Sequence, residues 1–340
     1  MLTSDFISHI SSGDYRITMR ESLTKNVYNQ ILSEYNLGEL KKSKVFTHGS
    51  VQTNVLLQTQ KGSVVLRYYK SRSKKSVEFE INLIKFLVKH EFPCPAPIKN
   101  KAGKFIGSLE NRSYVIFEYI DGVHLKKPSE VQKKQLVQKV AELQNIVGKY
   151  CPPNKGSRWN YNVKLCKKLS QSKAKELGTK NAKEKLKWYQ AALGNLHLPS
   201  NLPKGVCHCD FHFANILFKN SKFKALIDFD DANYTYKIFD LAAIMDPFVS
   251  AFNHNTWKKF KKDQNVFNFS ETKKIVAHYQ KYRPLNDNEK RHLFDVFKLV
   301  ILIYCLWNFF EGEASDFFER RKIEYLDSLG KEIFYQEIFM

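Results

Sequence analysis

The stretch CHCDFHFANILFKNSKFKALIDFDDA, residues 207–232, decides the fold of this chain. It contains two short apolar runs, Ile216–Phe218 and Phe223–Phe229, with Lys, Asn, Ser and Lys between them. Short apolar runs bounded by turn-forming residues predict two strands joined by a tight turn. The stretch therefore predicts a β-hairpin that is entered through a polar loop.

Three polar residues are expected at one end of this hairpin. Asp210 and Asn215 lie on the loop that enters the first strand, and Asp228 lies at the end of the second. An Asp in such a place can orient or deprotonate a hydroxyl group, while Asn and Asp oxygens can hold Mg²⁺ against a triphosphate. The sequence therefore favours phosphoryl transfer from a nucleotide to a hydroxyl.

The spacing of these residues resembles a known catalytic hairpin. His208-x-Asp210-x-x-x-x-Asn215, followed by Ile-Asp-Phe at 227–229, is similar to the kinase-like superfamily of aminoglycoside phosphotransferases, choline kinases and one type of homoserine kinase. The resemblance implies that Asp210 is catalytic and that Asn215 and the Asp of Ile-Asp-Phe hold Mg²⁺. His212 replaces the Lys of protein kinases, and Asp-Phe is followed by Asp rather than Gly, which both indicate a small-molecule kinase.

Two other interpretations of the stretch stay open. Cys207, His208, Cys209 and His212 are crowded enough to suggest zinc. However, alternate residues of an extended segment point to opposite sides, and no second Cys/His pair follows at zinc spacing. An acidic surface hairpin is the other interpretation, but it does not explain Asp and Asn at kinase spacing among apolar residues.

Composition indicates a basic globular protein with room for two lobes. The chain has 340 residues, 43% of them hydrophobic, and its 55 Lys and Arg outnumber 34 Asp and Glu to give a net charge of +21. Such a surface attracts anions, among them ATP, nucleic acid and anionic membrane. The six cysteines show no regular framework, which is typical of a reducing compartment.

The sequence also predicts a soluble, cytoplasmic protein. The start of the chain has no basic segment followed by an apolar core, so no signal peptide is expected. The longest apolar run, Leu299–Trp307, is shorter than the roughly 20 residues that cross a bilayer. This run predicts a buried helix.

The N-terminal part of the chain predicts an antiparallel meander. β-Branched and aromatic runs at Lys44–Thr47, Asn54–Thr59 and Ser63–Tyr69 are separated by turn-forming residues. Gly49 and Ser50 lie between the first two strands, where a turn could bring backbone N–H groups to ATP, although a plain hairpin turn is the simpler reading. Residues 1–20 form a peripheral extension to which no role is assigned.

An inward-facing carboxylate follows this meander. In the predicted helix from Ser76 to about His90, Glu80 shares a stripe with Val77, Ile84 and Leu87. An unpaired carboxylate there is costly, so we expect Glu80 to pair with Arg67, which stands where the resemblance places the phosphate-gripping Lys. The alternative is that Glu80 lies at the edge of the stripe and reaches solvent.

A connector and a hinge are expected to end the first lobe. The alternating prolines of Phe92–Pro97 predict an extended connector, and Ser113–Tyr119 predicts a strand. The next residues resemble the hinge whose backbone meets adenine, which implies nucleotide contacts from Glu118, Tyr119 and Ile120. The resulting fold class is α+β: a bilobal protein-kinase-like fold with a small antiparallel-sheet lobe at 1–119 and a mainly helical catalytic and substrate-binding lobe at 120–340.

The second lobe carries one more motif and one basic segment. Phe239-Asp240-Leu241-Ala242 resembles the Tyr-Asp-Leu-Ala of the superfamily, which implies that Asp240 caps its helix and, with His208, supports the catalytic loop. Residues 164–187 hold nine lysines against two glutamates. With Trp159, Tyr161 and Trp188 nearby they could bind nucleic acid, but a solvated helix face is the interpretation we favour.

Within the superfamily, the layout of the chain is closest to homoserine kinases. The similar segments are Leu66–Tyr69, Phe92-Pro93, Lys126–Pro128 and Arg283–Leu285. The last long helix, however, reads LVILIYCLWNFF and lacks the Arg expected there. We therefore expect an ATP- and Mg²⁺-dependent kinase of a small hydroxyl-bearing metabolite, with homoserine first among the acceptors.

Other acceptors and one other class of function remain as alternatives. A choline-like amino alcohol, an aminoglycoside or a sugar would keep the mechanism, and Asp230, Asp231 and Asp246 could supply an acidic pocket for a cationic acceptor. A catalytically silent kinase fold that binds nucleic acid or anionic lipid is the alternative from another class. The sequence leaves the oligomeric state open.

Overall fold

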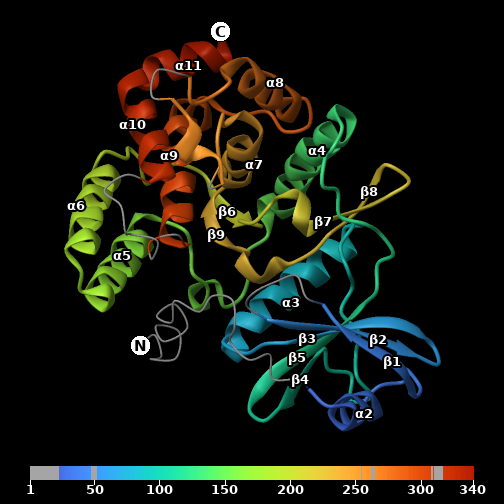
Figure 1. Ribbon diagram of the computed structural model, residues 1–340. Helices are drawn as coiled ribbons and strands as arrows, with labels where there is room; N and C mark the ends of the chain where they lie inside the picture. Colours follow the sequence, from blue (N-terminus) through green and yellow to red (C-terminus); the bar gives the residue numbers. More distant parts are fainter. Residues whose placement is uncertain (1–22, 47–51, 254, 262–264, 308, 310–316) are drawn as a thin grey trace. The chain divides into compact units, whose positions relative to one another are not determined.

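The computed structural model describes residues 23–46, 52–253, 255–261, 265–307, 309 and 317–340 (Figure 1). The chain divides into two compact units. The first unit comprises Met1–Leu125, Pro152–Arg158 and Ala214–Asp230, and the second comprises Lys126–Cys151, Trp159–Phe213 and Asp231–Met340. The lobe boundary at residue 120 stays a prediction, and each unit is described separately.

A five-stranded antiparallel sheet forms the centre of the first unit, which is the predicted kinase-like sheet. Its order is β1-β2-β3-β5-β4. The strands are β1 (Leu40–Val45), β2 (Thr53–Thr59), β3 (Gly62–Tyr68), β4 (Ile106–Leu109) and β5 (Arg112–Glu118). The predicted meander contains β2 and β3 but only the last two residues of β1, which begins four residues before the predicted start. The predicted strand Ser113–Tyr119 is present as β5, and β4 was not predicted.

The two faces of the sheet are covered by different helices, α2 (Lys25–Ser33) and α3 (Lys74–Lys89). Even-numbered residues of β3, such as Leu66, pack in one hydrophobic core with Ile31 and Leu32 of α2. Because side chains alternate along a strand, Arg67 points to the other face, toward α3. Figure 1 shows α2 and α3 on opposite sides of the sheet. This alternation brings Arg67 to Glu80.

The predicted hairpin is present as β7 (Ile216–Lys219) and β8 (Lys222–Leu226). Its two turn residues, Asn220 and Ser221, have φ of 51° and 61°, which is typical of a type I′ turn. The second strand ends at Leu226, earlier than predicted. Asp228 therefore follows the strand, with a left-handed φ of 62°.

The second unit is mainly helical, as predicted. Its long helix α9 (Asp287–Trp307) is buried along most of its length and packs against α7 (Phe239–Val249) and other helices. The remaining α-helices described in this unit are α4 (Glu130–Ile146), α5 (Val163–Leu177), α6 (Lys180–Gly194), α8 (Phe269–Gln280), α10 (Phe318–Leu329) and α11 (Lys331–Phe339). A short antiparallel pair, β6 (Lys204–Cys207) with β9 (Asn233–Tyr236), was missed by the sequence analysis. No helix among the described residues is long and apolar enough to cross a membrane.

The Lys-rich segment forms the helices α5 and α6 rather than one continuous helix, and not all of its lysines face solvent. Lys185 is buried, and its ammonium lies 4.2 Å from the centroid of the Phe317 ring. The aromatic residues considered for nucleic acid are engaged inside the unit: Trp159 stacks on Trp307 at 6.0 Å, and Trp188 meets Phe317 edge-on at 4.9 Å. These contacts disfavour the stacking role.

Candidate active site

The predicted catalytic residue Asp210 lies on a tight loop in the second unit, directly after β6. Its side chain is one-third exposed, and His212 Nε2 lies 3.1 Å from its Oδ1. The backbone N–H of Asp210 donates to Nδ1 of buried His208 at 3.3 Å. His208 thus contacts the loop from within, which agrees with the supporting role expected for it, while the Asp210 carboxylate remains accessible.

A buried carboxylate from α7 holds the residues just before Asp210. Asp240 Oδ2 accepts the N–H of His208 and Asp240 Oδ1 accepts that of Cys209, both at 2.8 Å. Cys209 has a left-handed φ of 65°, a conformation that a non-glycine residue adopts at a cost. The two hydrogen bonds compensate for this cost and fix the backbone that leads into Asp210.

Asp240 acts on the loop rather than on its own helix. Residue Ile238 occupies the N-cap of α7, and no side chain caps it. The predicted bracing of the loop is therefore present, but the predicted capping is not. Burial raises the pKa of Asp240, and His208, the loop N–H groups and Gln144 only partly offset that effect.

The cysteines around His208 are buried thiols. Cys207 Sγ donates to the Tyr236 carbonyl at 3.2 Å. Burial raises the pKa of both Cys207 and Cys209, which disfavours the thiolate that zinc requires. Among the described residues, no three His, Cys, Asp or Glu side chains gather as a metal site.

The first unit contains a buried cluster of charges around Arg67. Arg67 Nη2 donates to Asp228 Oδ1 at 2.7 Å, while its Nε lies 4.0 Å from Glu80 Oε1. Tyr69 supplies the closer partner of Glu80, since its hydroxyl donates to Oε1 at 3.0 Å. Arg67 and Glu80 do face each other, but Asp228 makes the tighter contact with the guanidinium.

Burial and the neighbouring charges shift the pKa values of this cluster in opposite directions. Burial lowers the affinity of Arg67 for its proton, but Asp228 and Glu80 outweigh that effect and raise the pKa well above its usual range. Burial also raises the pKa of Glu80, with Arg67 only partly offsetting it. Arg67 Nε and Glu80 Oε2 are buried with no hydrogen-bond partner among the described residues. The edge-of-stripe alternative for Glu80 is wrong, because its side chain is only 1% exposed.

Two further members of the cluster, Arg72 and Arg158, were not predicted from the sequence, and a third, Asp230, was predicted to have a different role. Arg72 binds the Asp230 carboxylate with Nε at 3.0 Å and Nη2 at 2.9 Å. Arg158 donates to the Phe229 carbonyl at 3.2 Å and to the Asp230 carbonyl. Asp230 is therefore committed to an internal ion pair and does not supply an acidic pocket for a cationic acceptor.

Asn215 and Asp228 are brought together by the hairpin. The N–H of Ile227 donates to the Asn215 carbonyl at 2.9 Å, so the residue before Asp228 is tied to Asn215. Asp228 is one-third exposed and, of its two oxygens, only Oδ1 accepts a hydrogen bond within the described chain. Carboxylate and amide oxygens suit Mg²⁺, so the pair fits the predicted metal.

The remaining predicted nucleotide contacts fall in different places. Glu118 exchanges two hydrogen bonds with Ala96, at 2.9 Å through its N–H and at 3.0 Å through Oε1. Tyr119 is 39% exposed and Ile120 is half-buried. Gly49 and Ser50 lie outside the described residues. Asp210 belongs to the second unit, whereas the metal pair belongs to the first, so their joint action stays a prediction.

Comparison with known proteins supplies the family. Residues 42–284 match the phosphotransferase enzyme family (APH). The chain belongs to this family. It is a small-molecule phosphotransferase, as the spacing of His208, Asp210 and Asn215 predicted.

Similar proteins support the assignment, and solved structures share the fold. The chain is 28% identical to a homoserine kinase of Rhodospirillum rubrum, over 76% of this chain and 77% of that protein. It is 30% identical to a homoserine kinase of Methylobacterium nodulans, with the same coverage. An amicoumacin kinase, solved with AMP-PNP and Ca²⁺, has the same fold with a TM-score of 0.63 at 15% identity, over 99% of this chain and 96% of that one. A spectinomycin phosphotransferase also shares the fold, with a TM-score of 0.57 at 12% identity, over 92% of this chain and 98% of that one.

Proposed function

We propose that this phosphotransferase transfers the γ-phosphoryl group of ATP to the hydroxyl of homoserine. The observation that carries the proposal is the loop at Asp210, whose backbone is fixed by the buried Asp240 while the Asp210 carboxylate stays accessible. A fixed, accessible carboxylate is what orientation of an attacking hydroxyl requires. The names of the relatives support homoserine as the acceptor.

In the proposed reaction, the acceptor oxygen attacks the γ-phosphorus and its proton passes to Asp210. The bond between the γ-phosphorus and the bridging oxygen breaks, and ADP leaves with that electron pair. Asn215 and Asp228 would hold Mg²⁺, which neutralises charge on the phosphates. Catalysis then rests on positioning and on charge stabilisation rather than on covalent chemistry.

Residues of the first unit would bind the nucleotide. Arg67 would contact the phosphates as a planar donor in place of a lysine, with Glu80 and Tyr69 keeping it oriented. The backbone of Glu118, Tyr119 and Ile120 would meet the adenine, and Gly49-Ser50 would cover the phosphates, as the resemblance implies.

ADP release with Mg-ATP tests this function. Wild type is compared across L-homoserine, choline, an aminoglycoside and a sugar. We expect homoserine turnover, and we expect Asp210→Ala to lower kcat by roughly 10² to 10⁴, the usual contribution of a general base. The matched control, Asp287→Asn, changes an exposed carboxylate at the start of α9 and should leave kcat unchanged.

ATP binding separates the catalytic role from a structural one. Asp210→Ala should still bind Mg-ATP, because Asp210 is not among the proposed ligands. An Asp210→Ala variant that loses ATP binding together with turnover would contradict its assignment. Turnover on choline, an aminoglycoside or a sugar in place of homoserine would keep the reaction and change the acceptor.

A further inference from the structure

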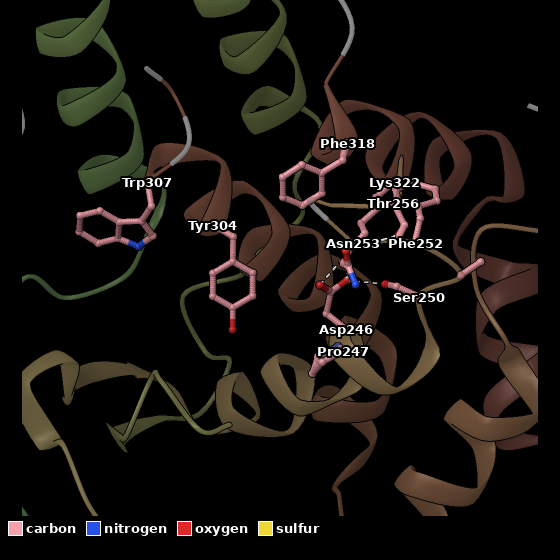
Figure 2. Close-up of a pocket in the computed structure, with 11 residues that line it drawn as sticks. Asp246, Pro247, Ser250, Phe252, Asn253, Thr256, Tyr304, Trp307, Phe318 and Lys322 are labelled. Carbon is pink, nitrogen blue, oxygen red and sulfur yellow. Dashed lines mark hydrogen bonds and ion pairs between the residues drawn. The ribbon is translucent and has the colours of Figure 1, made fainter. Parts of the chain in front are cut away.

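The second unit contains a cavity lined in part by Asp246, one of the residues considered for an acidic acceptor pocket. Its volume is about 560 Å³, within the roughly 300–1,000 Å³ typical of small-molecule sites. The end of α7, residues 250–253, Thr256, α9 and α10 line it (Figure 2). Its aromatic lining consists of Phe252, Tyr304, Trp307 and Phe318. An apolar wall with a few polar groups is the usual composition of a small-molecule site.

The polar groups of the cavity are a carboxylate and an ammonium. Lys322 Nζ lies 2.8 Å from both Asp246 Oδ1 and Asp246 Oδ2, and the Ser250 hydroxyl donates to Oδ1 at 2.8 Å. The side chains of Asp246 and Lys322 are only 14% and 3% exposed. The cavity thus offers one negative and one positive group next to each other, with no net charge between them.

This pair has hydrogen-bonding capacity left for a ligand. Lys322 carries three N–H donors, and within the part of the chain that the structure describes it donates only to the two oxygens of Asp246. At least one N–H therefore remains to bind an anion. Each carboxylate oxygen of Asp246 has two lone pairs, so Oδ2 can accept a further donor. The pair matches a ligand that carries an ammonium and a carboxylate close together.

Helix α7 links this cavity to the catalytic loop. Asp240 binds the backbone before Asp210, and Asp246 lies six residues further along the same helix, a rise of roughly 9 Å. Burial raises the pKa of Tyr304, which lines the cavity, and the carboxylates of Asp210 and Asp246 raise it further. The cavity therefore lies within electrostatic reach of the catalytic carboxylate, inside one unit.

We propose that this cavity binds the α-amino-acid end of the hydroxyl acceptor, with Asp246 contacting the ammonium and Lys322 the carboxylate. The inference rests on the proposed function and assigns the two side chains that would recognise its acceptor as a hydroxyl-bearing amino acid. A polycationic acceptor such as an aminoglycoside would bring several ammonium groups against Lys322, whose charge repels them. A neutral sugar would leave both buried charges without a ligand partner.

A series of three acceptors tests the roles of Asp246 and Lys322 in the wild-type protein, before any variant is made. L-Homoserine is compared with 3-aminopropan-1-ol, which lacks the carboxylate, and with 4-hydroxybutyrate, which lacks the ammonium. We expect wild-type kcat/KM to fall roughly 10- to 100-fold for each, the effect of removing one charged hydrogen bond. Equal or better turnover of 3-aminopropan-1-ol would overturn the inference and leave phosphoryl transfer intact.

Substitutions of Lys322 and Asp246 should then change the preferences among these acceptors in opposite ways. Lys322→Gln should remove the preference for homoserine over 3-aminopropan-1-ol but keep the preference over 4-hydroxybutyrate, and Asp246→Asn should do the reverse. Lys298→Gln is the matched control, because Lys298 is an equally buried lysine of α9 that pairs with Asp327 outside the cavity. It should preserve both preferences, since a general loss of stability does not select between acceptors.

Binding distinguishes failure of the inference from failure of the proposed function. If no acceptor is turned over, the proposed function is wrong, and homoserine binding is measured by saturation-transfer NMR. Homoserine binding by wild type that is lost in Lys322→Gln and kept in Lys298→Gln would still support the cavity as an amino-acid site. No binding to wild type would overturn it.

Discussion

Replacing Arg72 by Gln should strongly destabilise the first unit. Asp230 is only 7% exposed, and Arg72 binds its carboxylate with two hydrogen bonds, at 3.0 and 2.9 Å. Burial by itself raises the pKa of Asp230, but Arg72 and Arg67 reverse the effect and hold the pKa well below its usual range. The ionised carboxylate is therefore stabilised in the fold chiefly by the cation that the substitution removes.

The size of the effect follows from the partners that remain. Removing one member of a buried ion pair costs about 3–5 kcal/mol. Arg67 still lies 3.9 Å from Asp230, and Arg158 still binds its carbonyl, so we expect the lower end, about 3 kcal/mol. Arg72→Gln combined with Asp230→Asn leaves no buried charge unpaired, so the double variant should regain about 2 kcal/mol of this loss.

Urea unfolding at several pH values measures both effects. A group whose pKa is lowered by folding stabilises the fold above its unfolded pKa, and this stabilisation is lost as the pH falls through the folded value. Wild type should therefore lose the contribution of Asp230 as the pH falls below the ordinary Asp value of 3.8. The difference in unfolding free energy between wild type and Arg72→Gln should be full at pH 7 and should narrow in acid.

An exposed pair provides the control. Lys133 contacts Glu130 at 2.7 Å on the surface of α4, and Lys133→Gln should cost at most about 0.5 kcal/mol. An Arg72→Gln variant that loses no more than this control would refute the reasoning. So would an Asp230→Asn change that adds to the loss instead of relieving it.

Two further predictions concern the loop brace and the sheet. Asp240→Asn should lower kcat roughly 100-fold, because its amide nitrogen faces one of the two N–H groups that position the loop before Asp210. Its unfolding free energy should change by less than about 1 kcal/mol, because burial opposes the ionised form of Asp240 and raises its pKa, so removing the charge offsets the lost hydrogen bond. Gly107→Ala should cost about 1–3 kcal/mol in urea unfolding, because a Cβ there would lie 2.1 Å from the Tyr114 ring.

The hairpin of β7 and β8 could be predicted from sequence because its signals are local. Two apolar runs and a turn-forming pair fix β7 and β8 within a few residues, and the left-handed φ of Asn220 and Ser221 explains why those residues occupy the turn. The inward position of Glu80 was equally accessible, since helical periodicity alone places it on the apolar face of α3. Local patterns thus predicted the elements that carry the site.

The charge partners could not be predicted because they depend on distant contacts. Arg72 and Asp230 are separated by 158 positions in the sequence, and nothing near Asp230 distinguishes a carboxylate in an internal ion pair from one in an open pocket. The sequence around Asp246 likewise does not show whether its carboxylate lies in an internal ion pair or in a pocket. In the structure it lines a cavity together with Lys322. The cation of that cavity comes from α10, whereas the sequence analysis had sought an Arg on the preceding helix.

The contacts of Arg67 also explain why an arginine suits the position where the superfamily pattern has a lysine. One guanidinium faces three carboxylates through two of its nitrogens: Nη2 contacts Asp228 at 2.7 Å and approaches Asp230 at 3.9 Å, while Nε faces Glu80 at 4.0 Å. A lysine ammonium is a compact point charge and could not span these directions from one residue. Arg67, Arg72 and Arg158 balance Asp228, Asp230 and Glu80 in number, three against three. An arginine at position 67 is therefore what this balanced cluster requires, and its fork remains a good ligand for phosphate.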